Sequence, residues 1–162
     1  LLAPIRDLAN IIVDTSDHTV HTLRRYFVEE FATSAGSLDM NLTIMSFGHK
    51  HGMPVALDLL FDVRFLPNPH FVPDLRPLTG RHTEVIDYML TFQEVRETID
   101  RFGDLLEFLV PRYKREGRSY LTIGVGCTGG QHRSVMISEA LAEKLRKSGY
   151  RARATHRDVS KR

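Results

Sequence analysis

A glycine-rich segment between a predicted strand and a predicted helix constrains this chain more than any other feature. Residues 120–125 form a short apolar run rich in strand-forming side chains. Ile137, Leu141 and Leu145 then recur every four residues, as on one face of a helix. Between them, Gly126-Cys-Thr-Gly-Gly130 lets backbone N–H groups converge near the positive end of the helix dipole. The segment is therefore suited to hold an anion, most often a phosphate group.

The residues of this segment leave three interpretations open. It is a glycine-rich turn without a ligand, a cysteine phosphatase loop, or a phosphate or phosphosugar pocket without turnover. The phosphatase interpretation depends on Cys127 and Arg133, whose spacing resembles the Cys-x5-Arg loop of protein tyrosine phosphatases. A helix N-terminus favours the thiolate that such chemistry needs. No general-acid Asp can be located by spacing.

Length and composition favour one main domain, with part of a second. The 162 residues include 42% hydrophobic residues, which is enough for a core. No run of 18 apolar residues and no basic-then-apolar signal segment occurs, so we expect no membrane partner. Cys127 is the single cysteine, which excludes an internal disulfide and fits the reducing cytoplasm.

Positive charge is concentrated towards the end of the chain. Residues 144–162 contain eight Lys and Arg side chains and one acidic side chain, whereas the rest of the chain has an excess of acidic residues. The alternation in residues 150–156 predicts a strand with Arg151 and Arg153 on one face. Such a patch is an electrostatic footprint for nucleic acid, although a solvated helix end with a frayed tail has the same composition.

The first residues resemble the end of a separate domain. We predict a strand over residues 11–14, followed by a helix with Val20, Leu23 and Phe27 as its apolar stripe. Ala35-Gly-Ser37 marks the boundary, which separates residues 1–36 from residues 37–162. No Gly-x4-Gly-Lys-Ser/Thr loop occurs, so this chain cannot bind a nucleoside triphosphate by that route.

The second unit alternates between strand and helix. The predicted strands cover residues 42–47, 60–66, 120–125 and 150–156. Residues 83–115 are mostly helical, with Gly103 and Pro111 marking bends or breaks and a core stripe of Val95, Ile99, Phe102, Leu105, Leu106 and Leu109. The alternation predicts an α/β layered sandwich with a mostly parallel sheet and a phosphate-binding strand–loop–helix.

Polar loops follow three of the predicted strands. Because ligands bind beyond the carboxyl ends of strands in such sheets, residues 48–52, 67–71 and 126–133 should meet at one edge. Lys50 suits an anion contact there. His49 and His51 lack a carboxylate or thiol in register, so we expect no metal site.

Four motifs also resemble one protein family. They are Ser46-Phe-Gly-His-Lys-His-Gly52, Phe61-Asp-Val-Arg-Phe-Leu-Pro-Asn-Pro-His70, Leu75-Arg-Pro-Leu-Thr-Gly80 and Gly126-Cys-Thr-Gly-Gly-Gln-His-Arg-Ser134. They are similar to the C-terminal half of the RapZ/YvcJ family of bacterial RNase adapter or nucleotide-binding proteins. Residues 1–36 then resemble the end of that family's P-loop kinase-like domain, whose Walker A loop this chain lacks.

The resemblance implies a regulatory domain rather than an enzyme. It would bind small regulatory RNA, present it to an endoribonuclease, sense glucosamine-6-phosphate and form homo-oligomers, with no cofactor in this chain. ATP or GTP binding, and any hydrolysis, would belong to the parent protein. By matching motif, the phosphosugar site would comprise Asn68, His70, Arg118, Tyr120, Cys127, Thr128, Gly129, Gly130 and Arg133. RNA contacts would come from Lys50, Arg151, Arg153, Arg157, Lys161 and Arg162.

Overall fold

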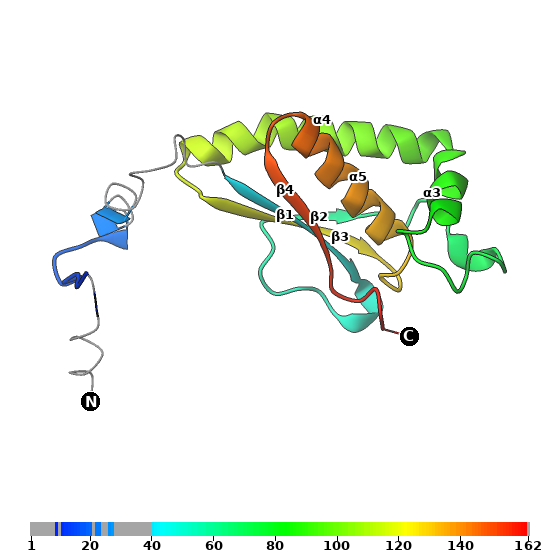
Figure 1. Cartoon of the computed structure of the whole chain (residues 1–162), viewed down its shortest axis with the longest axis horizontal. Helices are drawn as coiled ribbons and strands as arrows, with labels where there is room; N and C mark the ends of the chain where they lie inside the picture. Colours follow the sequence, from blue (N-terminus) through cyan, green and yellow to red (C-terminus); the bar gives the residue numbers. More distant parts are fainter. Residues whose placement is uncertain (1–8, 10, 21, 24–25, 28–39, 162) are drawn as a thin grey trace. The chain divides into compact units, whose positions relative to one another are not determined.

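The chain divides into two compact units, Leu1–Leu38 and Asp39–Arg162. The computed structural model describes residues 9, 11–20, 22–23, 26–27 and 40–161 (Figure 1). In the first unit, residues 11–15 have no regular secondary structure, so the strand predicted over residues 11–14 is wrong. A buried strand needs a paired neighbour, and the described residues give it none. The predicted boundary at residues 35–37 lies outside the described residues.

The helix predicted after that segment is present. Val20, Thr22, Leu23, Tyr26 and Phe27 are the described helical residues of the first unit. Within the described part of the chain, the predicted apolar stripe is not buried: Val20 is 83% exposed and Phe27 is 44% exposed.

Four parallel strands form the sheet of the second unit (Figure 1). They are β1 (Asn41–Gly48), β2 (Leu59–Asp62), β3 (Tyr120–Cys127) and β4 (Arg151–His156), and their order in the sheet is β2-β3-β1-β4. The pairing places Asn41 between Tyr120 and Arg151, and Gly48 opposite Cys127. This arrangement confirms the predicted α/β class and aligns the carboxyl ends of β1 and β3.

Strand β2 ends earlier than the sequence predicted. The prediction extended it to residue 66, but it stops at Asp62 and a turn follows. The Asp62 carboxylate accepts hydrogen bonds from the backbone N–H of Arg64 at 3.0 Å and from its guanidinium at 2.6 Å. These bonds lower the pKa of Asp62, and they explain why the chain turns here instead of continuing as a strand.

The helices are α3 (Thr83–Leu90), α4 (Gln93–Arg115) and α5 (Arg133–Lys147), with short 3-10 helices η1 (His49–His51) and η2 (Pro69–Phe71). The break between α3 and α4 falls at residues 91–92, whereas we predicted bends or breaks at Gly103 and Pro111, which lie inside α4. Gly103 serves helix packing instead, because a Cβ there would lie 2.5 Å from Cδ of Lys144 on α5.

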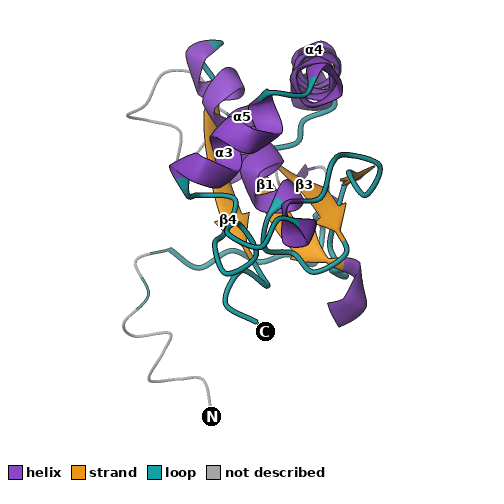
Figure 2. Ribbon diagram, turned by 90° about the vertical axis from the view of Figure 1, so that its right-hand side faces the viewer, coloured by secondary structure: helices purple, strands orange, loops and turns teal. Residues whose placement is uncertain are grey.

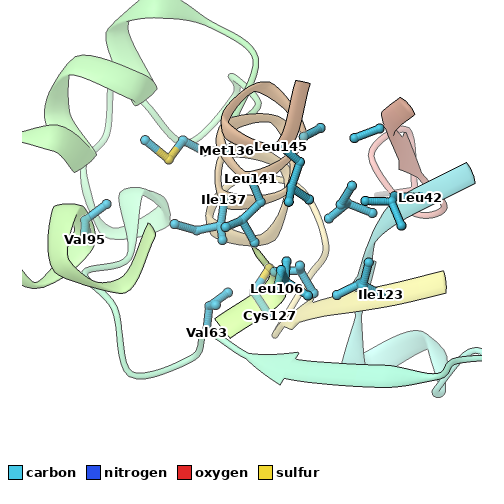
Figure 3. Packing of buried hydrophobic residues seen from close by; sticks show 14 of the residues in the cluster. Leu42, Val63, Val95, Leu106, Ile123, Cys127, Met136, Ile137, Leu141 and Leu145 are labelled. Atoms are coloured by element: carbon cyan, nitrogen blue, oxygen red, sulfur yellow. The ribbon is translucent and has the colours of Figure 1, made fainter. Parts of the chain in front are cut away.

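The core lies between the helices and one face of the sheet (Figures 1 and 2). Ile137, Leu141 and Leu145 are fully buried, as the spacing predicted, and they pack in one cluster with the buried side chains of the sheet (Figure 3). The stripe predicted for α4 is buried at Val95 and Leu106 but not at Leu105, which is 43% exposed.

The opposite face of the sheet carries no α-helix among the described residues, and at its carboxyl end His49 of η1 packs against Gly126. The loop between η1 and β2 crosses part of it, and Leu57 packs there against Gly124 at the middle of β3. Residues 55–60 contain two bends and then the start of β2. A hollow lies at the amino ends of β1, β3 and β4 in the described part of the chain.

Candidate functional site

The end of β1 and the glycine-rich segment approach each other so closely that side chains are excluded. A Cβ on Gly48 would lie 2.6 Å from the carbonyl carbon of Gly129. Gly130 has a φ of 77° and lies against the backbone N of Gly48. The backbone N–H of Lys50 also donates to the Thr128 carbonyl at 3.2 Å. The ends of β1 and β3 thus form one closely packed rim, as the predicted parallel sheet requires.

Cys127 lies at the base of this rim with its sulfur buried. The backbone N–H of Gly130 points to Sγ at 3.2 Å, and the Ser134 hydroxyl lies 3.1 Å from Sγ. The N–H of Gly130 therefore contacts the thiol, whereas the sequence had assigned it to a phosphate ligand.

Arg133 begins α5 and is 4% exposed. Its Nη1 donates to the backbone carbonyls of Arg64 at 2.6 Å and Leu66 at 3.2 Å. Its Nη2 lies 3.3 Å from the Thr128 hydroxyl, while its buried Nε has no hydrogen-bond partner in the described part of the chain. Burial lowers the pKa of Arg133. Nη1 of Arg133 therefore supports the turn after β2, and Nε remains as a donor near the site.

A cavity of about 190 Å³ opens at this rim. It is lined by Lys50, Asn68, His70, Cys127, Thr128, Gly129, Gln131, His132 and Arg133. The structure thus brings together six of the nine predicted phosphosugar residues, and places Gly130 directly behind them. The lining contains two permanent cations and no carboxylate, so its chemistry favours an anion.

A second cavity of about 610 Å³ adjoins the first. The two share Lys50, His70 and Gln131 as lining residues. The larger cavity continues between the loop over residues 73–79 and the segment Val159–Ser160. A ligand with an anionic end can therefore extend out of the smaller cavity towards the C-terminal segment.

Sequence reasoning missed His132 as a site residue. It lines the smaller cavity, is 5% exposed and has an Nε2 without a hydrogen-bond partner in the described part of the chain. Burial lowers the pKa of His132, although hydrogen bonds to the backbone of residues 75–78 oppose this. A neutral imidazole offers the cavity a hydrogen-bonding nitrogen suited to a sugar hydroxyl. Its place between Gln131 and Arg133, inside the glycine-rich motif, was the available signal.

The C-terminal segment is fastened to the same rim by Asp158, which is fully buried. Its carboxylate accepts from the backbone N–H of Gly48 at 2.8 Å and pairs with Arg157 at 2.6 Å and Lys161 at 2.8 Å. Burial by itself would raise the pKa of Asp158. The hydrogen bonds from Arg157, Lys161 and Gly48 have a larger, opposite effect and hold this pKa well below its usual range. Gln131 Nε2 adds a bond of 2.7 Å to the Lys161 carbonyl.

The predicted RNA-binding residues fall into two groups. Lys50, Arg157 and Lys161 lie at the carboxyl ends of the strands, where Arg157 also donates to the carbonyls of Gly48 and Gly52. Arg151 and Arg153 lie at the amino end of β4, both exposed and on one face, as the alternation predicted. Arg162 is outside the described residues.

Two predicted phosphosugar residues do not reach the cavity. Tyr120 begins β3, and Arg118 lies just before it, so a whole strand separates both from Cys127 at its end. Arg118 pairs instead with Asp58. The two ends of a strand lie on opposite sides of the sheet, so Arg118 and Tyr120 do not line this cavity within the described chain.

His49 of η1 packs between an aromatic ring and a carboxylate. Nε2 of His49 lies 3.8 Å from Oδ1 of Asp62, and its ring packs on Phe47 with centroids 5.0 Å apart. Among the described residues, no group of three or more His, Cys, Asp and Glu side chains could hold a metal ion.

No helix in the described ranges is long and apolar enough to cross a membrane.

The fold and site together define a parallel α/β domain whose glycine-rich strand–loop–helix forms a basic, carboxylate-free cavity. The family described as the RapZ C-terminal domain matches residues 40–160, and the chain belongs to this family. This match confirms the resemblance seen in the sequence motifs.

Curated relatives support the assignment over almost the whole chain. A nucleotide-binding protein of Acidobacterium capsulatum is 52% identical over 158 residues, which cover 98% of this chain and 52% of that protein. One from Koribacter versatilis is 49% identical over 162 residues, covering 99% and 53%. Another from Bacillus velezensis is 47% identical over 162 residues, covering 100% and 54%. The chain thus spans about half the length of the curated relatives it matches.

Proposed function

We propose that this chain is a regulatory domain that senses an amino-sugar phosphate and binds small regulatory RNA, in the manner of an RNase adapter. The observation that carries the proposal is the cavity at the rim, lined by Lys50, Arg133 and two histidines with no carboxylate. Charge of one sign in a small concave site favours an anion with directional donors around it.

The size of the two cavities supports a phosphosugar rather than a bare phosphate. The smaller one, of about 190 Å³, suits a phosphate group beside Lys50 and Thr128. The larger one, of about 610 Å³, begins at His70 and provides room for a sugar ring. The amide of Asn68 and the ring of His132 add neutral hydrogen-bonding groups, which sugar hydroxyls require.

The RNA part of the proposal depends on the basic residues of the second unit. Lys50 and Lys161 lie beside the cavity, and Arg151 and Arg153 lie at the other end of β4. Nucleic-acid affinity arises largely from such phosphate contacts, which release counterions. The ion pairs of Lys161 and Arg157 with Asp158 mean that these two side chains also have a structural role.

The proposal also covers the longer protein from which this chain would come. We infer that the parent protein binds ATP or GTP in a part that this chain does not span, consistent with the nucleotide-binding name of its relatives. We further propose a cytoplasmic homo-oligomer that delivers its RNA to an endoribonuclease, with no cofactor held by this chain.

Calorimetry with glucosamine-6-phosphate tests the phosphosugar proposal. We expect binding to the wild type, and weaker binding to Lys50→Gln and Thr128→Val, because each loses a contact to the phosphate. His132→Gln should reduce the preference for the phosphosugar over inorganic phosphate. Arg101→Gln on α4 is the matched charge control and should bind as the wild type does. Equal affinity for all variants would place the ligand elsewhere.

A Cys-x5-Arg phosphatase is the second candidate, and the contacts of Cys127 Sγ with Gly130 and Ser134 favour it. A thiolate would accept both hydrogen bonds. However, the cavity has no lining carboxylate to protonate a leaving group, so we expect no turnover. An aryl phosphate assay of the wild type and Cys127→Ser decides: hydrolysis that disappears in Cys127→Ser would replace the sensor proposal by an enzyme.

A further inference from the structure

A hollow that extends from the sheet face bearing Tyr120 around the edge strand β4 to Arg146 of α5 has a composition unlike that of the rim. It has a volume of about 840 Å³ and lies at the amino ends of β1, β3 and β4. Three arginines (Arg146, Arg151 and Arg153) and two tyrosines (Tyr120 and Tyr150) line it, with threonine and asparagine side chains between them. No carboxylate is among the lining residues. This hollow therefore combines positive charge with accessible aromatic surface.

The strand register arranges these side chains in two rows across the sheet. Tyr120, Asn41 and Arg151 are paired neighbours in the first row. Thr122, Thr43 and Arg153 form the second. Adjacent strands lie about 4.8 Å apart, so the tyrosine and the arginine of the first row are about 10 Å apart. Consecutive rows are about 7 Å apart along the strands.

Tyr120 presents its ring to solvent. Tyr120 is 71% exposed, even though β3 is one of the two central strands of the sheet. The neighbouring Thr122 is half-buried and Asn41 is exposed, so small polar side chains surround the ring. Arg153 lies flat along the same face, with Nε 3.3 Å from the Thr43 hydroxyl. An exposed ring about 10 Å from the arginines of β4, on the same face of the sheet, suits an unpaired base and its phosphates.

We propose that this hollow binds a single-stranded segment of RNA, with a base stacked on Tyr120 and phosphates held by Arg151 and Arg153. The inference rests on the RNA part of the proposed function and assigns it a second contact area, separate from the rim that carries Lys50 and Lys161. Base stacking requires an unpaired nucleotide, so the hollow discriminates single strands from duplexes. Tyr120 thus has an RNA role in place of the phosphosugar role that the motif match suggested.

Fluorescence anisotropy with a labelled unstructured RNA, and with the same RNA in a duplex, tests this proposal on the full chain. Tyr120→Ala should weaken single-strand binding by about 5- to 100-fold, and Tyr120→Phe should retain it, because a ring still stacks. The double variant Arg151→Gln/Arg153→Gln should lower the slope of log affinity against log salt by about 1.4, the value for two lost phosphate contacts. Neither change should affect duplex binding to the same degree.

Matched controls lie on α4, on the helical side of the sheet. Phe108→Ala removes a ring that is 54% exposed, and Arg101→Gln removes an exposed charge, so both should bind RNA as the wild type does. If the wild type binds no RNA, the proposed function fails. If Lys50→Gln weakens binding while the Tyr120 and arginine variants match the wild type, this inference alone fails. A shift of Tyr120→Ala to a smaller species in sedimentation would also overturn it, since a second copy would then cover the face.

Discussion

The carboxylate of Asp158 accepts a hydrogen bond from the backbone N–H of Gly48 at 2.8 Å, although 110 positions separate the two residues in the chain. This bond closes the carboxyl end of β1 with the segment that follows β4. The glycine-rich segment lies against the same spot, since Gly130 contacts both residues. The cavity and the C-terminal segment therefore share one structural support.

Removal of the Asp158 carboxylate should loosen this support. We expect Asp158→Ala to lower the free energy of unfolding by about 1.5–3 kcal/mol, because Gly48, Arg157 and Lys161 all lose a partner. Urea denaturation monitored by circular dichroism measures the change. A loss below about 0.5 kcal/mol, the level typical of neutral surface changes, would contradict the structural role.

The same carboxyl group predicts an acid-dependent loss of stability. Its pKa is lower in the folded chain than its ordinary value of 3.8, so the unfolded chain takes up this proton first as the pH falls. The stabilisation is therefore complete above pH 4 and is lost as the pH falls below 3.8. Denaturation curves between pH 6 and pH 3 should show a smaller decline for Asp158→Asn than for the wild type. Parallel declines would refute the assignment.

Two glycines of the rim make a matched pair. Gly48→Ala places a methyl group 2.6 Å from a backbone carbon, and we expect it to lower stability by about 1–3 kcal/mol. Gly129→Ala meets no atom closer than 3.9 Å, so stability should be unchanged or rise by about 0.4–1 kcal/mol. Because Gly129 lines the cavity, its variant should still bind glucosamine-6-phosphate more weakly. Equal stability of the two variants would contradict the close approach.

Arg133 is expected to affect folding as well as ligand binding. Its bonds to the Arg64 and Leu66 carbonyls are buried, so Arg133→Ala should cost about 1.5–3 kcal/mol of stability without any ligand. Thermal unfolding of the ligand-free variant measures this cost, with Arg101→Ala as the exposed arginine control. If Arg133→Ala unfolds at the wild-type temperature, the guanidinium does not support the turn after β2.

The buried His132 side chain should make the free energy of unfolding depend on pH near neutrality as well. Burial lowers its pKa below the ordinary value of 6.5, so the unfolded chain binds this proton more readily than the folded chain. Stability should therefore fall as the pH drops below 6.5, and the fall should be smaller in His132→Gln. Unfolding free energies at pH 7.5 and pH 5.5 give the comparison. An identical change in both proteins would show that His132 does not contribute.

Local patterns in the sequence determined much of this fold. The recurrence of Ile137, Leu141 and Leu145 every four residues predicted the buried face of α5. The alternation in residues 150–156 predicted that Arg151 and Arg153 lie on the same face of β4. The glycine-rich motif located the cavity and most of its lining. These features depend on periods of two and 3.6 residues and on backbone freedom, which neighbouring residues set among themselves.

Only the tertiary structure decided which distant groups meet. In the folded chain the Arg133 guanidinium donates to two backbone carbonyls after β2, and Asp158 accepts a hydrogen bond from Gly48. The length of β3 separates Tyr120 from the cavity. The tertiary structure also ended β2 at Asp62 and formed the hollow at the amino ends of β1, β3 and β4. Such choices depend on strand order, register and close packing between segments far apart in the chain. Local periodicity carries no information about those contacts.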